Sequence, residues 1–278
     1  MVSSNADLCR EHVAQADRDR YLSVLYALEE KRPHLFALYA FNAEVAEITG
    51  RVREALPGEI RLQWWRDVLT GGEYSGEGVP LADALLATIN EFKLPPSAFE
   101  AYLDARIGDL YADPFQDRTE LEAYCGQTAS AMIQLACLIL DPASARLAAE
   151  AAGHGGCAMG IAGLIRLMPL HRARGKCSDP LDLLKAAGLT PEGFLAGENT
   201  VCVSSAVEMM ATLAQEHYGK FAAAAASLPA SLRPALLPVA LTPAHLGKVR
   251  AEKPFDEARP LSDLRRQWIL MRSAARGW

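Results

Sequence analysis

Apolar residues recur at intervals of three and four along most of the chain, and this spacing limits the possible folds more than any other sequence feature. In residues 32–48 it links Leu35, Leu38, Val45 and Ile48. Residues so spaced share one face of a helix, since a turn takes 3.6 residues. Alternating apolar and polar patterns joined by hairpin turns, which predict strands, are nearly absent. The sequence therefore predicts an all-α fold.

The same periodicity and the signals for helix ends give approximate bounds. Pro33 suits a first helical turn, Gly71 the end of a helix, and Asp117 or Thr119 an N-cap. Residues 153–156 predict a glycine-rich turn between two helices. We expect helices at 19–29, 32–48, 59–69, 80–92, 96–112, 119–140, 143–151, 159–168, 180–187, 191–196, 201–227 and 262–275, and one short helix within 228–243.

Length and composition indicate one globular domain covering residues 1–278. Hydrophobic residues make up 50% of the chain and charged residues 22%, and no segment is suited to link two domains. The net charge of −6 argues against nucleic acid as a partner, because nucleic-acid-binding proteins are usually basic. The six cysteines lack metal-binding spacing and indicate buried free thiols in a reducing compartment.

The N-terminal residues are polar and contain no apolar core of a signal peptide. Apolar stretches such as 129–140 are shorter than the roughly 20 residues that a membrane span needs. We therefore expect a cytoplasmic protein. Peripheral attachment to the inner membrane stays open.

Four segments together resemble the squalene/phytoene synthase family. They are the run from Arg32 to Val45, the run Arg61-Leu62-Gln63-Trp64-Trp65-Arg66-Asp67, residues 102–110, and residues 120–125. The similarity extends from about residue 10 to about residue 190 and is weaker beyond. It implies the isoprenoid (terpenoid) synthase fold, a single helical bundle around a central cavity.

The chemistry of that family joins two prenyl diphosphates. Mg²⁺ ions bridge the leaving diphosphate to two motifs that carry aspartates at positions i and i+4. In this chain the corresponding positions are Ala46 and Gly50 in the first motif and Leu167 and His171 in the second. Residues 153–178 contain no Asp or Glu. We therefore predict no catalytic residues, no metal site and no cofactor, with Mg²⁺ required only if the chain is an atypical transferase.

One branch of the family has sequence features like those of this chain. The Ala-Phe-Asn-x-Glu run at 40–44 and residues 58–65 resemble the branch that includes a mitochondrial complex I assembly factor and its bacterial relatives. The resemblance implies a non-catalytic assembly factor, or a protein that binds a lipid or isoprenoid, with respiratory complex I subunits as partners. Two alternatives stay open: a prenyltransferase of the phytoene or squalene synthase type with an atypical site, and a peripheral protein of an anionic membrane surface.

Several side chains are candidates for a cavity or ligand site. Aromatic residues at helical spacing could line a prenyl-chain cavity or pack in the core. Arginines could hold a phosphate or form ion pairs with nearby acids. For His171, a solvated loop is favoured over a ligand or base. The candidates are Arg32, Tyr39, Phe41, Glu44, Glu47, Trp65, Arg66, Asp109 and Arg166.

The last 18 residues, 261–278, predict a basic amphipathic helix. Arg265, Arg266, Trp268 and Arg272 are the candidates for contact with a membrane or a partner. Packing of this helix against its own domain is the competing interpretation.

Overall fold

The computed structural model describes residues 4–52, 54–71, 76, 78–197, 199–256 and 259–278, and the regular elements within these ranges are helices. This confirms the all-α prediction. The elements of ten or more residues are α1 (Asn5–Ala16), α3 (Arg32–Arg51), α4 (Ala55–Thr70), α5 (Pro80–Phe92), α6 (Pro96–Ile107), α8 (Ala131–Leu140), α9 (Ala149–Ala173), α12 (Thr200–Ala225) and α15 (Asp263–Arg276).

Shorter helices join these elements. The α-helical ones are α2 (Arg18–Val24), α7 (Arg118–Cys125), α10 (Leu181–Ala186), α11 (Pro191–Ala196), α13 (Arg233–Leu236) and α14 (Thr242–Leu246). The 3₁₀ turns are η1 (Glu29–Lys31), η2 (Gly108–Leu110), η4 (Ala145–Ala148), η5 (Ala230–Leu232) and η6 (Leu237–Leu241), and η3 (Gly126–Ser130) is a π-helical segment.

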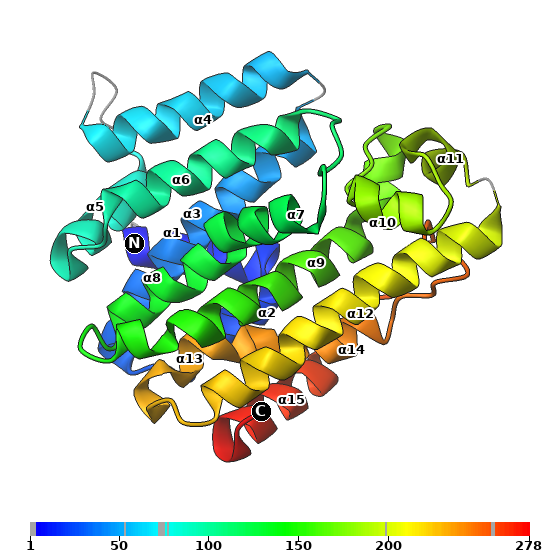
Figure 1. Ribbon diagram of the computed structural model, residues 1–278. Coiled ribbons are helices and arrows are strands. Elements are labelled where there is room, and N and C mark those ends of the chain that lie inside the picture. The colour runs from blue at the N-terminus through cyan, green and yellow to red at the C-terminus, as the bar shows by residue number, and fades with distance from the viewer. Residues whose placement is uncertain (1–3, 53, 72–75, 77, 198, 257–258) are drawn as a thin grey trace.

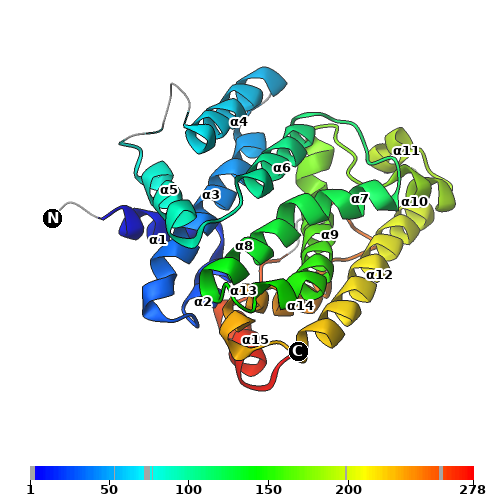
Figure 2. The ribbon, with the colours of Figure 1, turned by 60° about the vertical axis from the view of Figure 1, so that its left-hand side comes forward.

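Two helices form the centre of the bundle. The buried helix α3 packs against α1, α5 and α8, while α9 runs antiparallel to α12 along its length (Figure 1). Both views place α10 and α11 at one end of the bundle, beyond the C-terminal end of α9 (Figure 2). At the outer edge, α15 packs against α2 and η6. Helices α3 and α9 provide two walls of the cavity described below.

Helix α9 corrects the predicted turn at 153–156. It is continuous over Ala149–Ala173 and keeps its glycines inside the helix. A Cβ on Gly156 would overlap the backbone and Oγ of Ser130, and one on Gly155 would come within 3.0 Å of the Phe221 ring. These glycines permit close contact between helices, and the prediction of a turn from them was wrong.

The sequence signals for helix ends at three other positions agree with the structure. Pro33 lies in the first turn of α3, and Gly71 ends α4 with a φ of 71°. The Asp117 carboxylate caps α7 by accepting a hydrogen bond from the Glu120 N–H at 2.9 Å. The sequence prediction missed α1, whose apolar residues are few. It also gave one helix where η5, α13 and η6 follow one another.

One continuous helical stretch, 118–140, is long and apolar enough by length and composition to cross a membrane. It joins α7, η3 and α8, close to the helix predicted at 119–140. The expectation that no apolar segment is long enough to span a membrane was therefore wrong by length and composition. Half of its apolar window is buried inside the bundle, as in the core helix of a folded domain.

Candidate functional site

A cavity of about 540 Å³ lies between α3 and α9. Its remaining walls come from the α1–α2 connection, the π-helical segment η3, and the η6–α14 region. Small residues on the two central helices leave this space open. The residues contributed by α3 and α9 are Asn42, Ala43, Ala46, Glu47, Met159, Gly160, Ala162, Gly163, Leu164, Arg166 and Leu167.

The π-helical segment shapes one wall. A π-turn inserts an extra residue into a helix, and such turns often occur at functional sites. Here it follows Tyr124 and contains Thr128, and both side chains line the cavity. The Thr128 hydroxyl donates to the Tyr124 carbonyl oxygen at 2.7 Å, which ties the Thr128 side chain to the preceding turn.

The lining contains three carboxylates, and each is already engaged by a cation. Asp17 pairs with Arg20 at 2.5 Å, and Glu47 pairs with Arg51 one turn further along α3. Asp19 accepts hydrogen bonds from His245 and Arg266.

The Asp19 contacts join three parts of the chain. His245 Nε2 and Arg266 Nε each lie 2.6 Å from an Asp19 carboxylate oxygen. Burial alone would raise the pKa of Asp19, but these two partners outweigh it and hold that pKa below its ordinary value. The Asp19 carboxylate is therefore a fixed structural anion between α2, α14 and α15.

Arginines outnumber acids around the cavity. Arg18, Arg20, Arg106, Arg166 and Arg266 all line it. Four of them are paired with aspartates: Arg18 with Asp263, Arg20 with Asp17, Arg106 with Asp109, and Arg266 with Asp19 and Asp263.

Arg166 differs from the other four. Within the described part of the chain, no ion pair or hydrogen bond engages its guanidinium. It is exposed on α9, at the wall of the cavity. A guanidinium with free donors matches the geometry of a phosphate or carboxylate.

Sequence comparison identifies the family. The family model described as squalene/phytoene synthase matches residues 13–267. The chain belongs to the squalene/phytoene synthase family. The predicted resemblance is therefore confirmed.

Relatives of known name fall into two groups. The bovine protein named NADH dehydrogenase (ubiquinone) complex I, assembly factor 6 is 29% identical over 244 residues, covering 87% of this chain and 73% of its own length. Phytoene synthase of Rhodobacter capsulatus is 22% identical and covers 99% of this chain and 82% of its own length.

Solved structures agree on the fold. A dehydrosqualene synthase crystallised with a ligand superposes with a TM-score of 0.82 at 17% identity, covering 98% of this chain and 95% of that one. This confirms the isoprenoid synthase fold that the resemblance implied.

The structure also locates the residues that the sequence resemblance matched to the family's aspartates. Ala46 on α3 and Leu167 on α9, matched to the first aspartate of each motif, both line the cavity from opposite walls. Neither has an oxygen ligand, and the second positions, Gly50 and His171, are outside the lining. Among the described residues there is no group of three or more His, Cys, Asp or Glu that could hold a metal ion. These residues do not fit the Mg²⁺ ions that the family uses, because Mg²⁺ requires several oxygen ligands.

The aromatic candidates lie in the core and not at the cavity. Tyr39, Phe41 and Trp65 are at most 3% exposed. The rings of Phe41 and Trp65 meet edge to face at 4.9 Å, which is a favourable packing geometry. Burial raises the pKa of Tyr39 well above its ordinary value, and its hydroxyl has no partner among the described residues. Of the two possibilities, a cavity wall or the core, these three residues lie in the core.

Three charged candidates are engaged away from the cavity. Arg32 donates to the carbonyl oxygens of Ala27 and Leu25, at 3.0 and 3.1 Å. Glu44 lies 3.6 Å from Arg61, and Arg66 pairs with Asp104. Of the nine candidates, Glu47 and Arg166 are the two in the cavity lining.

Asp109 belongs to a second, adjoining cavity of about 320 Å³. It lies 2.9 Å from Arg106 and 3.8 Å from the Lys176 amino group, and the Tyr124 hydroxyl donates to it. Desolvation opposes the charge on Arg106, yet nearby Tyr102, Tyr124 and Asp109 raise its pKa well above the ordinary value. The ion pair with Asp109 fixes the position of Arg106, and Arg106 in turn lines the main cavity.

The sequence favoured a solvated loop position for His171, and the structure contradicts this. His171 lies in the last turns of α9, where its Nδ1 is 2.9 Å from the Ser178 hydroxyl. Burial lowers its pKa to about 4, with a further contribution from Lys176, so the ring is neutral near pH 7.

Sequence reasoning missed the segment from Asp17 to Arg20 and its distant partner His245. The four alternating charges at the N-cap and in the first turn of α2 were a usable signal for a charged wall. The partners of Asp19 are 226 and 247 residues away, and no local pattern could have indicated them.

Proposed function

We propose that this chain is a non-catalytic member of its family that binds an anionic ligand of the isoprenoid or lipid type and acts in the assembly of respiratory complex I. One observation carries the proposal. The cavity has arginines at its walls, and Ala46 and Leu167, which the sequence resemblance matched to metal-binding aspartates, offer no side-chain ligand there.

The charge of the walls supports direct binding of an anion. In the metal-dependent reaction, acidic side chains hold cations that in turn hold the diphosphate. Here the acids of the lining are engaged in ion pairs, and Arg166 is available for the ligand. Binding without activation of the leaving group stabilises the bound ligand but not a carbocation, so we infer binding without turnover.

The link to complex I rests on the relatives. Several bear the name complex I assembly factor 6, and the bovine one aligns with most of this chain. Likeness of fold alone does not determine function. The cytoplasmic location that the sequence indicated stays part of this proposal.

Turnover is the first test. Purified protein is incubated with farnesyl or geranylgeranyl diphosphate and Mg²⁺, and products are extracted and identified. We expect the diphosphates to be recovered unchanged. Formation of squalene or phytoene would establish the alternative, a transferase with an atypical site that uses Glu47 and the arginines.

Binding of farnesyl diphosphate, measured by calorimetry, is the second test. Arg166→Gln should weaken binding by about tenfold to a hundredfold, the value of a charged hydrogen bond to phosphate. Arg146→Gln is the matched control, because Arg146 is exposed on η4 and lies outside the cavity lining. Equal affinity in both variants would remove Arg166 from the proposed site.

The assembly role needs a test in cells. Deletion of the gene should reduce the amount of fully assembled complex I, as seen by native gel electrophoresis and NADH oxidation by membranes. A copy carrying Arg146→Gln should restore assembly, and a copy carrying Arg166→Gln should not. Normal complex I in the deletion strain would contradict this part of the proposal.

A further inference from the structure

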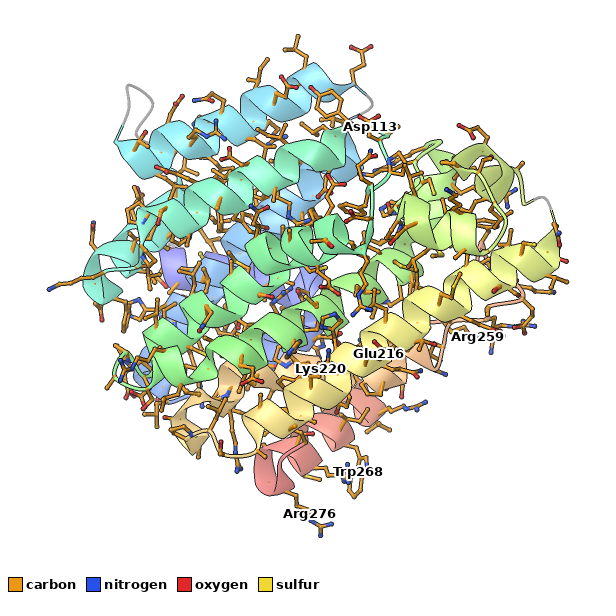
Figure 3. All side chains as sticks on the ribbon, viewed as in Figure 1. Asp113, Glu216, Lys220, Arg259, Trp268 and Arg276 are labelled. Carbon is orange, nitrogen blue, oxygen red and sulfur yellow. The ribbon has the colours of Figure 1, made fainter. Side chains whose placement is uncertain are left out.

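The outer face of α15 carries an apolar stripe that the fold leaves uncovered. Leu264, Trp268 and Met271 are 81%, 62% and 50% exposed. Their spacing of four and then three residues places them on one side of the helix. Figure 3 shows Trp268 and Arg276 pointing away from the bundle. An exposed apolar patch of this kind marks an interaction surface.

The opposite face of the same helix is fixed to the protein. Leu270 and Ser273 are buried there, and Arg266 holds the helix through its contact with Asp19. The helix therefore cannot turn its apolar stripe inward without losing its own packing. The stripe needs a partner from outside the described chain.

A neighbouring segment extends the apolar surface. Leu25 and Tyr26, at the end of α2, are each 42% exposed and line a groove of about 460 Å³ together with the stripe. Leu28, two residues after Tyr26, is 67% exposed. The combined surface is a ridge beside a shallow apolar groove, which suits insertion into a soft apolar layer.

Charge indicates what that layer is. Helix α15 contains four arginines and one aspartate, a local charge of +3 on a chain whose net charge is −6. Arg265, Arg272 and Arg276 are exposed and have no carboxylate partner among the described residues. A tryptophan within an apolar stripe bordered by arginines is the composition of helices that lie in the headgroup region of anionic bilayers.

We infer that the α2–α15 surface docks this protein on an anionic lipid bilayer, with Leu264, Trp268 and Met271 inserted below the headgroups and the exposed arginines at the phosphates. Long arginine side chains can reach the headgroups while their stems stay beside the apolar layer. The inference does not depend on the ligand of the cavity.

The arrangement also relates the surface to the cavity. Arg18 and Arg20 at the start of α2 line the cavity, whereas Leu25 and Tyr26 at its end line the groove. Docking through this surface would hold one cavity wall next to the bilayer.

Flotation of the full chain with vesicles tests the inference. We expect the protein to float with vesicles of phosphatidylcholine mixed with phosphatidylglycerol, and to stay unbound with phosphatidylcholine alone. Leu264→Ser with Trp268→Ser should reduce the bound fraction by about tenfold or more, because two inserted apolar side chains are lost. Arg265→Gln with Arg272→Gln should reduce it by roughly fivefold per arginine.

The chain offers a matched control on α4. Leu56 and Ile60 are 64% and 62% exposed with the same spacing of four residues, but Glu54 and Glu59 lie beside them. Leu56→Ser with Ile60→Ser should leave flotation unchanged. Circular dichroism melts of each variant verify folding.

Three outcomes would overturn the inference. The wild-type chain could fail to float with anionic vesicles, the α4 control could lose as much binding as the α15 variant, or flotation could be insensitive to the arginine substitutions. Self-association of the wild-type chain that the α15 variant abolishes, with no flotation, would assign the surface to a second copy instead.

Discussion

Arg174 donates a hydrogen bond from its Nη2 to the carbonyl oxygen of Gly50, at 2.8 Å, and so joins the C-terminal ends of α9 and α3. The sequence resemblance matched Gly50 to the second aspartate of the first motif. The end of a helix carries partial negative charge and unsatisfied carbonyl groups, which a guanidinium stabilises. A protein cation thus connects the ends of the two helices that form the cavity walls.

Helix α9 allows a sharp test of its close packing. Gly156→Ala should destabilise the fold by about 3 kcal/mol or more, because the new methyl group overlaps the Ser130 backbone, which cannot move as a flexible side chain can. Gly153→Ala in the same helix meets nothing within 4 Å and should stabilise by up to about 1 kcal/mol through helix propensity. Urea denaturation of both variants measures the difference, and similar midpoints would show that α9 has no such contact.

How far the sequence alone could predict this structure depends on the range of each interaction. Pro33, Gly71 and Asp117 act within one turn of chain, so their roles were readable. The glycines of α9 were misread because a glycine signals a turn or a close contact equally well. Only the position of Ser130, 26 residues earlier, decides between them for Gly156.

The site was predictable to a similar extent. The resemblance to the family matched Ala46 and Leu167 to metal-binding aspartates, and both residues line one cavity. The charged wall could not be predicted, because Asp19 gains its role from His245 and Arg266 at the far end of the chain. Likewise, aromatic spacing cannot distinguish a cavity wall from the core position of Phe41.

Asp19 should make stability depend on acid pH. Its pKa is lower in the folded protein than in the unfolded chain, so its contribution is present above the ordinary carboxyl range and is lost as the pH falls through the folded value. Asp19→Asn should cost about 2–3 kcal/mol near neutral pH, since Arg266 loses a buried partner.

Urea denaturation between about pH 3 and about pH 7 measures this effect, and the gap between wild type and Asp19→Asn should narrow toward the acid end. Asp263→Asn serves as the control. Asp263 also contacts Arg266 but is 53% exposed, so its loss should cost no more than about 0.5 kcal/mol. An equal cost for the two variants would contradict the structural role of Asp19.

Asp179 should have the opposite pH dependence. It is 1% exposed, its Oδ1 has no partner among the described residues, and burial raises its pKa to about 7. A folded-state pKa above the unfolded value means that the wild type loses stability as the pH rises from about 4 through about 7.

Asp179→Asn removes the charge at this position. We expect it to stabilise the protein by about 1–3 kcal/mol near pH 8 and by much less near pH 4. The value is below the full linkage limit because the amide also needs hydrogen-bond partners. Denaturation curves at both pH values provide the measurement, and a variant less stable than wild type near pH 8 would show that the Asp179 carboxylate has a favourable partner.

Metal dependence distinguishes the two interpretations of the cavity most directly. If arginines bind the anion themselves, the Kd of farnesyl diphosphate in EDTA should equal or fall below the Kd in Mg²⁺. The reason is that Mg²⁺ neutralises part of the diphosphate charge that the arginines attract.

A metal-bridged site requires the reverse result. Affinity for the diphosphate should then rise on adding Mg²⁺ and fall again in Glu47→Gln, since Glu47 is the carboxylate that α3 contributes to the lining. Calorimetric titrations of wild type and Glu47→Gln in both buffers decide the matter. Tight binding that needs Mg²⁺ and Glu47 would restore the metal to this site and reopen catalysis.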